Sequence, residues 1–125
     1  MKKLIPAAVL AAILSLSLWN SAQMEADTAR WRSQLAQIDP LIEAGAWSTL
    51  EELLAGSYAS WSARQTYLHI VTEHDAVDDA ESMYRRCMAF AAAREPSELR
   101  AEPADLRDQL RLLAEMERLS WRNIL

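Results

Sequence analysis

The chain begins with an apolar run and then changes to a repeating mixture of apolar and charged positions. Lys2 and Lys3 precede residues 4–19, which are mostly hydrophobic. As a helix, residues 4–22 would extend about 28 Å at about 1.5 Å per residue, close to the hydrocarbon thickness of a bilayer. A basic start followed by such a run is typical of a cleaved secretory signal or of an uncleaved membrane anchor.

The residues near the end of this run favour an anchor. Cleavage after Ala22 would place Asn20, instead of a small residue, in the third position before the cut. Trp19 suits the interface between a bilayer and water. We therefore predict a transmembrane anchor, or else a signal peptide, in residues 1–23. Residues 24–125 are expected to form a domain outside the cytoplasm of a single-pass protein of the cell membrane, because the lysines remain inside.

Beyond the apolar run, hydrophobic residues recur every three or four positions, which is the spacing of one helical face. The first such helix starts near Met24, is expected to kink at Pro40 because its apolar stripe keeps its phase there, and ends at Gly45. A second helix is predicted to begin with a capping box at Ser48–Glu51 and to continue to about residue 71. Within it, Gly56 is expected to permit close packing.

Two further helices complete the pattern. The third is predicted to begin between Thr72 and Asp75, with Thr72 as a capping residue, and to end before Pro96. The fourth is predicted to start at Ser97, with a kink or a restart at Pro103. Its apolar face continues to Met116, and the run of charged residues 115–118 is expected to face solvent.

Four amphipathic helices with short connections predict an all-α fold, an antiparallel bundle of about four helices behind the N-terminal anchor helix. None of these helices could bury its stripe alone. The aromatic residues are assigned to packing between the helices, with a ligand groove as the alternative use. They are Trp31, Trp47, Trp61, Tyr67 and Tyr84.

Composition excludes several classes of function. A net charge of −5 and the absence of lysine after Lys3 argue against nucleic acid as a partner. The lone cysteine, Cys87, lies on an apolar stripe and is expected to be a small buried hydrophobe. With two glycines in 125 residues, the chain has no glycine-rich phosphate loop, and no serine lies in a Gly-x-Ser-x-Gly elbow. We expect neither enzymatic activity nor a cofactor.

One cluster of side chains has the types needed for metal binding or acid–base chemistry. His74 and Asp78 are four residues apart and share a helical face, with Glu81 one turn further on. His69 and Glu73 form a second pair of the same kind. The predicted role of His74 and Asp78 is structural, a capping and charge-assisted contact at the joint between the second and third helices. A metal site made by His74, Asp78 and Glu81 is the alternative.

Several short motifs, taken in order, resemble a family of bacterial envelope proteins called domain of unknown function 4363. They are the lysine-led anchor, the AGAW turn at Ala44–Trp47, Trp61 with Tyr67 six residues on, His74 followed by Val77-Asp78, and the closing Asn123–Leu125. The resemblance implies an all-helical domain outside the membrane, without known catalytic residues. It also implies a multi-pass membrane protein as a partner. Tyr67, where the family more often has tryptophan, and Pro103 depart from its pattern.

These observations lead to one expected function and one alternative. The expected function is a non-enzymatic, membrane-tethered interaction domain that is accessory to an integral membrane protein. The alternative is a ligand- or metal-sensing helical bundle that uses the cluster of His74 and Asp78.

Overall fold

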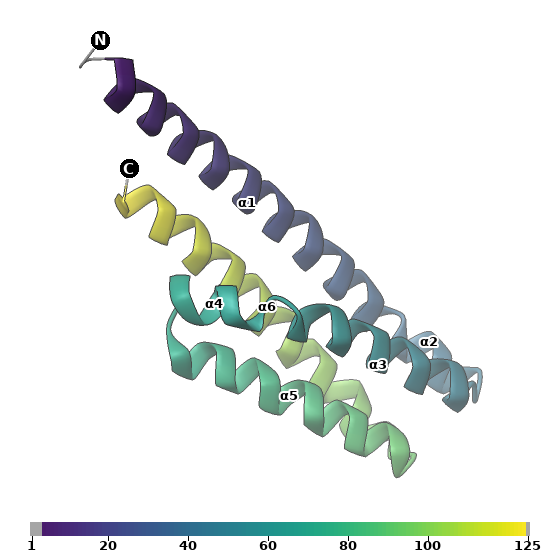
Figure 1. Ribbon diagram of the computed structural model, residues 1–125. Helices are drawn as coiled ribbons and strands as arrows, with labels where there is room; N and C mark the ends of the chain where they lie inside the picture. Colours follow the sequence, from purple (N-terminus) through teal and green to yellow (C-terminus); the bar gives the residue numbers. More distant parts are fainter. Residues whose placement is uncertain (1–3, 125) are drawn as a thin grey trace.

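The computed structural model describes residues 4–124, and these residues form six helical segments and no strand (Figure 1). The predicted all-α fold is therefore confirmed. Lys2, Lys3 and Leu125, which belong to the predicted anchor and to the closing motif, lie outside the described residues. The segments are α1 (Leu4–Ala36), α2 (Ile38–Glu43), α3 (Trp47–Ser62), α4 (Gln65–Val71), α5 (His74–Ala92) and α6 (Pro96–Ile124).

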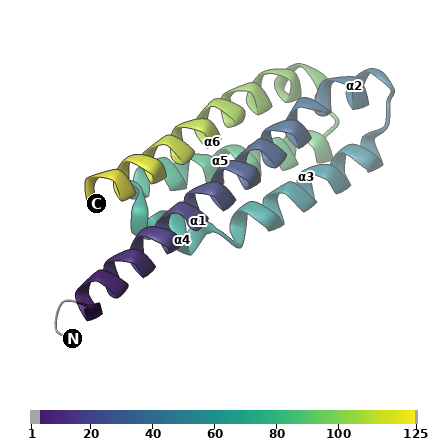
Figure 2. The same cartoon turned by 90° about the horizontal axis from the view of Figure 1, so that it is seen from above.

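The six segments form four rods, because α2 continues α1 and α4 continues α3. The α1 rod packs against α3 and α6, and α5 packs against the same two helices from the other side. Neighbouring rods run in opposite directions, and the two chain termini lie toward the same end of the bundle (Figures 1 and 2). This is the antiparallel bundle that the sequence predicts.

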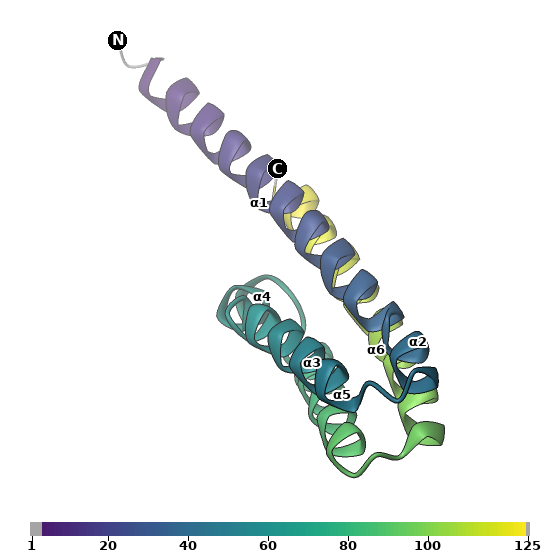
Figure 3. The same ribbon diagram turned by 90° about the vertical axis from the view of Figure 1, so that its right-hand side faces the viewer.

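The N-terminal half of α1 extends beyond the other helices, and its apolar side chains are exposed (Figure 3). In the part of the chain that the structure describes, this rod is the one long and apolar enough to cross a membrane. A signal sequence has the same length and composition. The helix continues without a break from this projecting segment into the bundle, so the apolar run and the first bundle helix are a single α1.

Buried positions on each rod are separated by alternating steps of four and three residues. A mean spacing of 3.5 residues keeps one seam of each helix facing its neighbours, as in left-handed coiled coils. The predicted apolar stripes of the bundle are confirmed by these positions. They include Met24, Thr28, Trp31 and Leu35 in α1, Leu50, Leu54, Ser57 and Trp61 in α3, Val77, Ala80, Tyr84, Cys87 and Ala91 in α5, and Leu106, Leu110, Leu113 and Glu117 in α6.

The kink predicted at Pro40 is present, but the helix is interrupted three residues earlier, at Gln37. The Gln37 N–H donates to the Gln34 carbonyl at 3.1 Å, a bond between residues three apart that interrupts the α-helical pattern. Pro40 explains the interruption, because its ring crowds the carbonyl four residues earlier and it has no N–H to donate. The buried stripe resumes in α2 at Ile38 and Ile42.

The capping box predicted at Ser48–Glu51 is wrong. The structure starts α3 at Trp47 after Ala46, whose side chain makes no capping hydrogen bond. Gly45, at φ +67°, reverses the chain so tightly that the Ala46 N–H donates to the Leu41 carbonyl. This backbone turn, with Trp47 packed against the core, determines where the helix begins.

The second helix, predicted as one element, is broken at Ala63 and Arg64. The Arg64 N–H donates to the Trp61 carbonyl at 2.9 Å, so the chain tightens by one turn before α4 begins. Before the break α3 packs against α1 and α5, and after it α4 packs against α6 and α5. After the break α4 continues the rod of α3 with a changed set of neighbours, and Tyr67 reaches α6.

The third and fourth helices lie close to their predicted bounds, but their ends differ in detail. Thr72 donates its hydroxyl to the Leu68 carbonyl and closes α4, so it does not cap α5, which starts at His74. The fourth helix begins at Pro96 and continues through Pro103 without a restart. Pro103 lies on the buried face between Leu99 and Leu106, and packing on both sides holds the helix together there.

Gly56 does not provide close packing, contrary to the prediction. A Cβ atom built at this position has no neighbour within 4 Å, and the residue is exposed inside α3. The glycine therefore weakens the helix without any compensating contact.

We expect Gly56→Ala to stabilise the protein by about 1 kcal/mol, because alanine restricts the unfolded chain and fits the helix. Thermal unfolding of the full-length protein in detergent, followed by circular dichroism, should show a melting temperature higher by about 4 °C. Gly45→Ala is the matched control and should lower it, because alanine is strained at φ +67°. An unchanged or lower melting temperature for Gly56→Ala would show that the glycine has a structural role.

Candidate functional site

The histidine cluster lies at the exposed joint between α4 and α5. The Nδ1 atoms of His69 and His74 are 2.8 Å apart, so one ring donates a hydrogen bond to the other. The Asp78 carboxylate lies 3.8 Å from His69 Nε2. The expected contact between His74 and Asp78 is therefore replaced by two contacts to His69, which lies in the last turn of α4.

Glu81, the third residue of the alternative metal site, is held elsewhere. Its Oε1 accepts hydrogen bonds from the Tyr58 hydroxyl at 2.7 Å and from Arg85 Nε at 3.0 Å. The bond to Glu81 raises the pKa of Tyr58, with burial as a smaller cause. Within residues 4–124, no three His, Cys, Asp or Glu side chains are grouped so that they could hold a metal ion.

Three of the aromatic residues fill the core instead of lining a groove. Trp31, Trp61 and Tyr84 are at most 1% exposed. The ring centroids of Trp61 and Tyr84 are 5.3 Å apart, and the Tyr84 hydroxyl shares a buried hydrogen bond of 2.8 Å with Ser57. Trp47 is half-buried beside this core. These contacts join α3 to α5, and the Trp31 Nε1–H, which donates to Ser60 Oγ at 3.0 Å, joins α1 to α3.

Cys87 is buried in α5, as its position on the apolar stripe predicts. Burial raises the pKa of its thiol to about 12, Glu102 adds to the increase, and Arg86 opposes it. The thiol is therefore protonated at neutral pH and packs as a small hydrophobic side chain.

Glu117 is a completely buried carboxylate at the end of the bundle where α1 extends away. It is 0% exposed, so the prediction that residues 115–118 form a solvated face is wrong at this position. Glu117 Oε1 accepts hydrogen bonds from Ser21 Oγ at 3.1 Å and from the Tyr67 hydroxyl at 2.8 Å. Ser21 Oγ also lies 3.3 Å from Oε2. The carboxylate is thus satisfied by neutral donors from α1 and α4.

Tyr67 extends this arrangement to Trp121. The Trp121 Nε1–H donates to the Tyr67 hydroxyl at 2.8 Å, and that hydroxyl donates to Glu117. Burial raises the pKa of Tyr67 to about 12, and Glu117 contributes in the same direction. The Arg64 guanidinium lies 5.2 Å from the centre of the Tyr67 ring. We call Ser21, Tyr67, Glu117 and Trp121 the Glu117 network.

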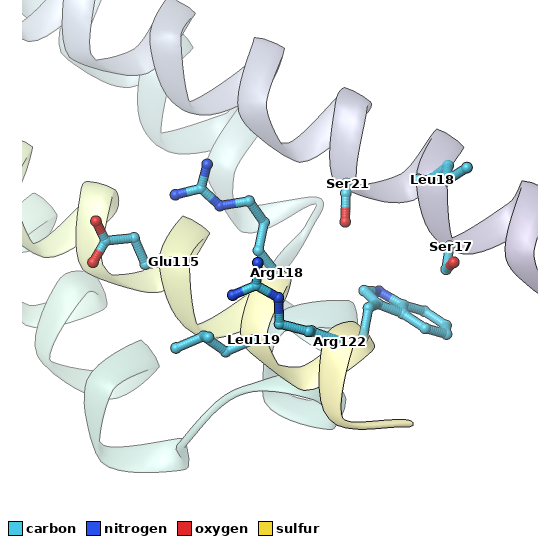
Figure 4. Close-up of a pocket in the computed structure, with 8 residues that line it drawn as sticks. Ser17, Leu18, Ser21, Glu115, Arg118, Leu119 and Arg122 are labelled. Carbon is cyan, nitrogen blue, oxygen red and sulfur yellow. The ribbon is translucent and has the colours of Figure 1, made fainter. Parts of the chain in front are cut away.

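A groove lies beside this network, between α1 and α6 (Figure 4). Its volume is about 560 Å³, and a hollow of about 200 Å³ continues from it along both helices, with Ser21 and Arg118 common to the two. Arg118 extends from α6 into the space below α1, and Ser21 faces it (Figure 4). Leu18 and Leu119, on opposite walls, are 64% and 51% exposed. We call the two spaces together the α1–α6 groove.

The spacing of Glu117 in the sequence indicates that it is buried, although a charged residue is usually expected at the surface. Glu117 follows Leu113 by four residues and continues the spacing of the buried stripe on α6. Ser21 precedes Met24 by three residues on α1 in the same way. Polar residues that keep the phase of an apolar stripe are expected inside a bundle, provided that they find hydrogen-bond partners. The partner Tyr67 depends on the break between α3 and α4.

The chain belongs to the family described as domain of unknown function (DUF4363), whose model matches residues 18–124. The resemblance of its motifs to that family is thereby confirmed. The match begins inside α1 and includes both Ser21 and Glu117, so the site lies within the family's domain. No curated protein and no solved structure matches the chain.

We expect Tyr67→Phe to lower stability by about 1–3 kcal/mol, because it leaves Trp121 Nε1 without its acceptor and removes a donor from buried Glu117. Thermal unfolding in detergent measures the effect. Tyr58→Phe is the matched control and should cost less, because Glu81 retains its bond to Arg85 when that hydroxyl is removed. Equal effects of the two variants would contradict a special role for the Glu117 network.

Proposed function

We propose that the protein is a non-enzymatic, membrane-tethered helical domain outside the cytoplasm, accessory to an integral membrane protein. The observation that carries this proposal is the continuity of α1. Its projecting apolar half joins, without a break, the part that packs against α3 and α6 (Figure 3). A rigid helical connection of this kind suits a domain that is held at a fixed position over a membrane.

The Glu117 network supports retention of the N-terminal segment. Cleavage after Ala22 would remove Ser21, a hydrogen-bond donor to the buried Glu117 carboxylate. It would also remove Ser17, which is 2% exposed. Leaving a buried carboxylate short of a donor destabilises a protein by about 1–3 kcal/mol. Folding of the bundle is thus coupled to an intact α1, which favours an anchor over a signal peptide.

The distribution of charge supports an orientation with the bundle outside. Lys2 and Lys3 lie at one end of the apolar segment, and basic residues next to a membrane helix remain in the cytoplasm. Trp19, 58% exposed near the other end, suits the interface on the bundle's side. Residues 1–23 then form the anchor and residues 24–125 the extracytoplasmic domain.

The projecting half of α1 also supports an interaction inside the membrane. Ala7 and Ala11, and likewise Ala8 and Ala12, are four residues apart. Small residues at this spacing let membrane helices approach closely. A multi-pass partner of the kind implied by the family resemblance would supply the second helix. The metal-sensing alternative has less support, since Glu81 is occupied by Tyr58 and Arg85.

The anchor is tested by the mass of the full-length protein recovered from membranes after alkaline extraction. We expect an intact chain that includes Ser21 and that remains in the membrane fraction. Ser21→Ala should stay intact and attached but melt at a lower temperature, because Glu117 loses a donor. A mature chain that begins at Gln23 would contradict the tether and leave a secreted bundle.

The partner is tested by a photo-crosslinking amino acid placed at Leu10, which is 60% exposed on the projecting part of α1. In native membranes we expect an adduct with a multi-pass membrane protein. The matched control is the same substitution at Glu52, exposed on α3 within the bundle, which should not form that adduct. Adducts with lipid alone or with a second copy of this chain would contradict an accessory role.

A further inference from the structure

The α1–α6 groove has an unusual composition for this chain. Its walls carry four arginines, Arg32, Arg111, Arg118 and Arg122, against the two glutamates Glu25 and Glu115. The chain as a whole has a net charge of −5. The groove is therefore a locally basic surface on an acidic protein, and its charge favours an anionic ligand.

The arginines of this groove are only weakly engaged by carboxylates. Arg118 lies 3.9 Å from Glu25, and Arg111 lies 4.0 Å from both Asp108 and Glu115, at the limit of an ion pair. Within residues 4–124, Arg122 has no carboxylate within 4.0 Å. Guanidinium groups held in this way can donate to a phosphate, whose oxygens match their planar geometry.

The inner end of the groove contains polar atoms that lack a partner. Thr28 is 6% exposed, and its hydroxyl is buried without a hydrogen bond. Arg32 Nε, one turn further along α1, is likewise buried and unbonded. Both atoms are enclosed by protein and lack a hydrogen-bond partner among residues 4–124, which is unusual for buried polar groups.

The location of the groove selects the kind of ligand. Its outer end is lined by Ser17 and Leu18, in the last turns of the apolar part of α1, and by Arg122 from α6, whereas Leu119 lies further from this end along α6 (Figure 4). If α1 crosses the bilayer as proposed, this end opens at the level of the lipid headgroups. The exposed Leu18 and Leu119 can contact the apolar part of a lipid, while Arg118 and Arg122, one turn apart on α6, can donate to its phosphate. The volume of about 560 Å³ is within the range of small-molecule sites.

We propose that the α1–α6 groove binds the phosphate headgroup of an anionic phospholipid, with Arg118 and Arg122 as its ligands. This inference rests on the proposed membrane tether, because the tether presents the groove to lipid. Binding joins α1 and α6 beside the Glu117 network, so a bound lipid stabilises the end of the bundle where the two helices meet the membrane.

The experiment uses the full-length protein in detergent and short-chain phosphatidylglycerol, with phosphatidylcholine of the same chain length for comparison. Native mass spectrometry measures the lipid retained by wild type and by Arg118→Gln/Arg122→Gln. We expect wild type to prefer phosphatidylglycerol, and the double variant to bind it roughly thirty-fold more weakly, from about 1 kcal/mol for each charge. A double variant with unchanged affinity would overturn the proposal.

The matched control is Arg94→Gln/Arg100→Gln, which removes two exposed arginines, one between α5 and α6 and one near the start of α6. The turn between α5 and α6 lies at the end of the bundle opposite the chain termini (Figure 1). This control variant should retain the preference of wild type. Arg122 has no ion pair with a carboxylate of residues 4–124, so Arg122→Gln alone should weaken binding several-fold while the melting temperature stays that of wild type. An equal loss of affinity in the Arg94/Arg100 variant would show that the effect comes from net charge alone and would contradict the proposed site.

Competition with inorganic phosphate distinguishes a site for a lipid headgroup from a site for a free phosphate ion. We expect that an excess of phosphate displaces little phosphatidylglycerol, because it lacks contacts to Leu18 and Leu119. Full displacement by phosphate would show a site for a free anion and overturn the lipid assignment. The binding assay does not require insertion into a bilayer. Loss of lipid preference with an intact anchor would therefore contradict this inference alone, whereas a cleaved N-terminus would contradict the proposed tether.

Discussion

Burial of the Glu117 carboxylate constrains three helices at once. A carboxylate removed from water is tolerated only where protein donors replace the lost solvent, and here these are the hydroxyls of Ser21 and Tyr67. Ser21 requires α1 to be present and aligned with α6, and Tyr67 requires α4 to pack against α6. Trp121 in turn donates to Tyr67, which keeps the last turns of α6 in the same contact. Polar groups of this kind specify one arrangement of helices more strictly than apolar contacts do, because an unmade bond at this place is costly.

The break between α3 and α4 follows from the same constraint. A straight continuation of α3 would remain beside α1 and α5, the helices that it contacts along its length. The tightened turn at Arg64 instead turns α4 toward α6. Arg64 itself is held between α1 and α4, since its Nε lies 3.3 Å from Asp27 and its guanidinium lies over the ring of Tyr67. The turn, the ion pair and the cation–π contact thus act together to place the Tyr67 hydroxyl at the Glu117 carboxylate.

A single helix that serves two environments links this packing to the function that we propose. The projecting half of α1 is apolar around its circumference, whereas the other half is apolar along one seam. The two halves meet between Ser17 and Met24, where hydroxyl groups replace hydrophobic side chains on the seam. The α1–α6 groove and the Glu117 network lie at this transition. Polar groups at this transition can form hydrogen bonds within the bundle or with the headgroup region of a bilayer. The hydrocarbon region of a bilayer offers no such partners.

The sequence by itself determined the helical class, the approximate bounds of the third and fourth predicted helices and the buried stripe of α5. Steps of three and four residues and the conformations of proline and glycine are local properties. Other predictions were wrong because they depend on contacts between segments. They are the capping at Ser48 and Thr72, the packing assigned to Gly56 and the pairing of His74 with Asp78. Each depends on how the next segment turns, and His69, for example, reached Asp78 only through the path of the chain around residue 72. The buried carboxylate kept the phase of its stripe, so its position was readable from spacing, but its donors were not. Ser21 and Tyr67 are 96 and 50 residues away from it in the chain. Only the tertiary structure decided that they meet, because a buried charge is stable only where distant segments supply its hydrogen bonds.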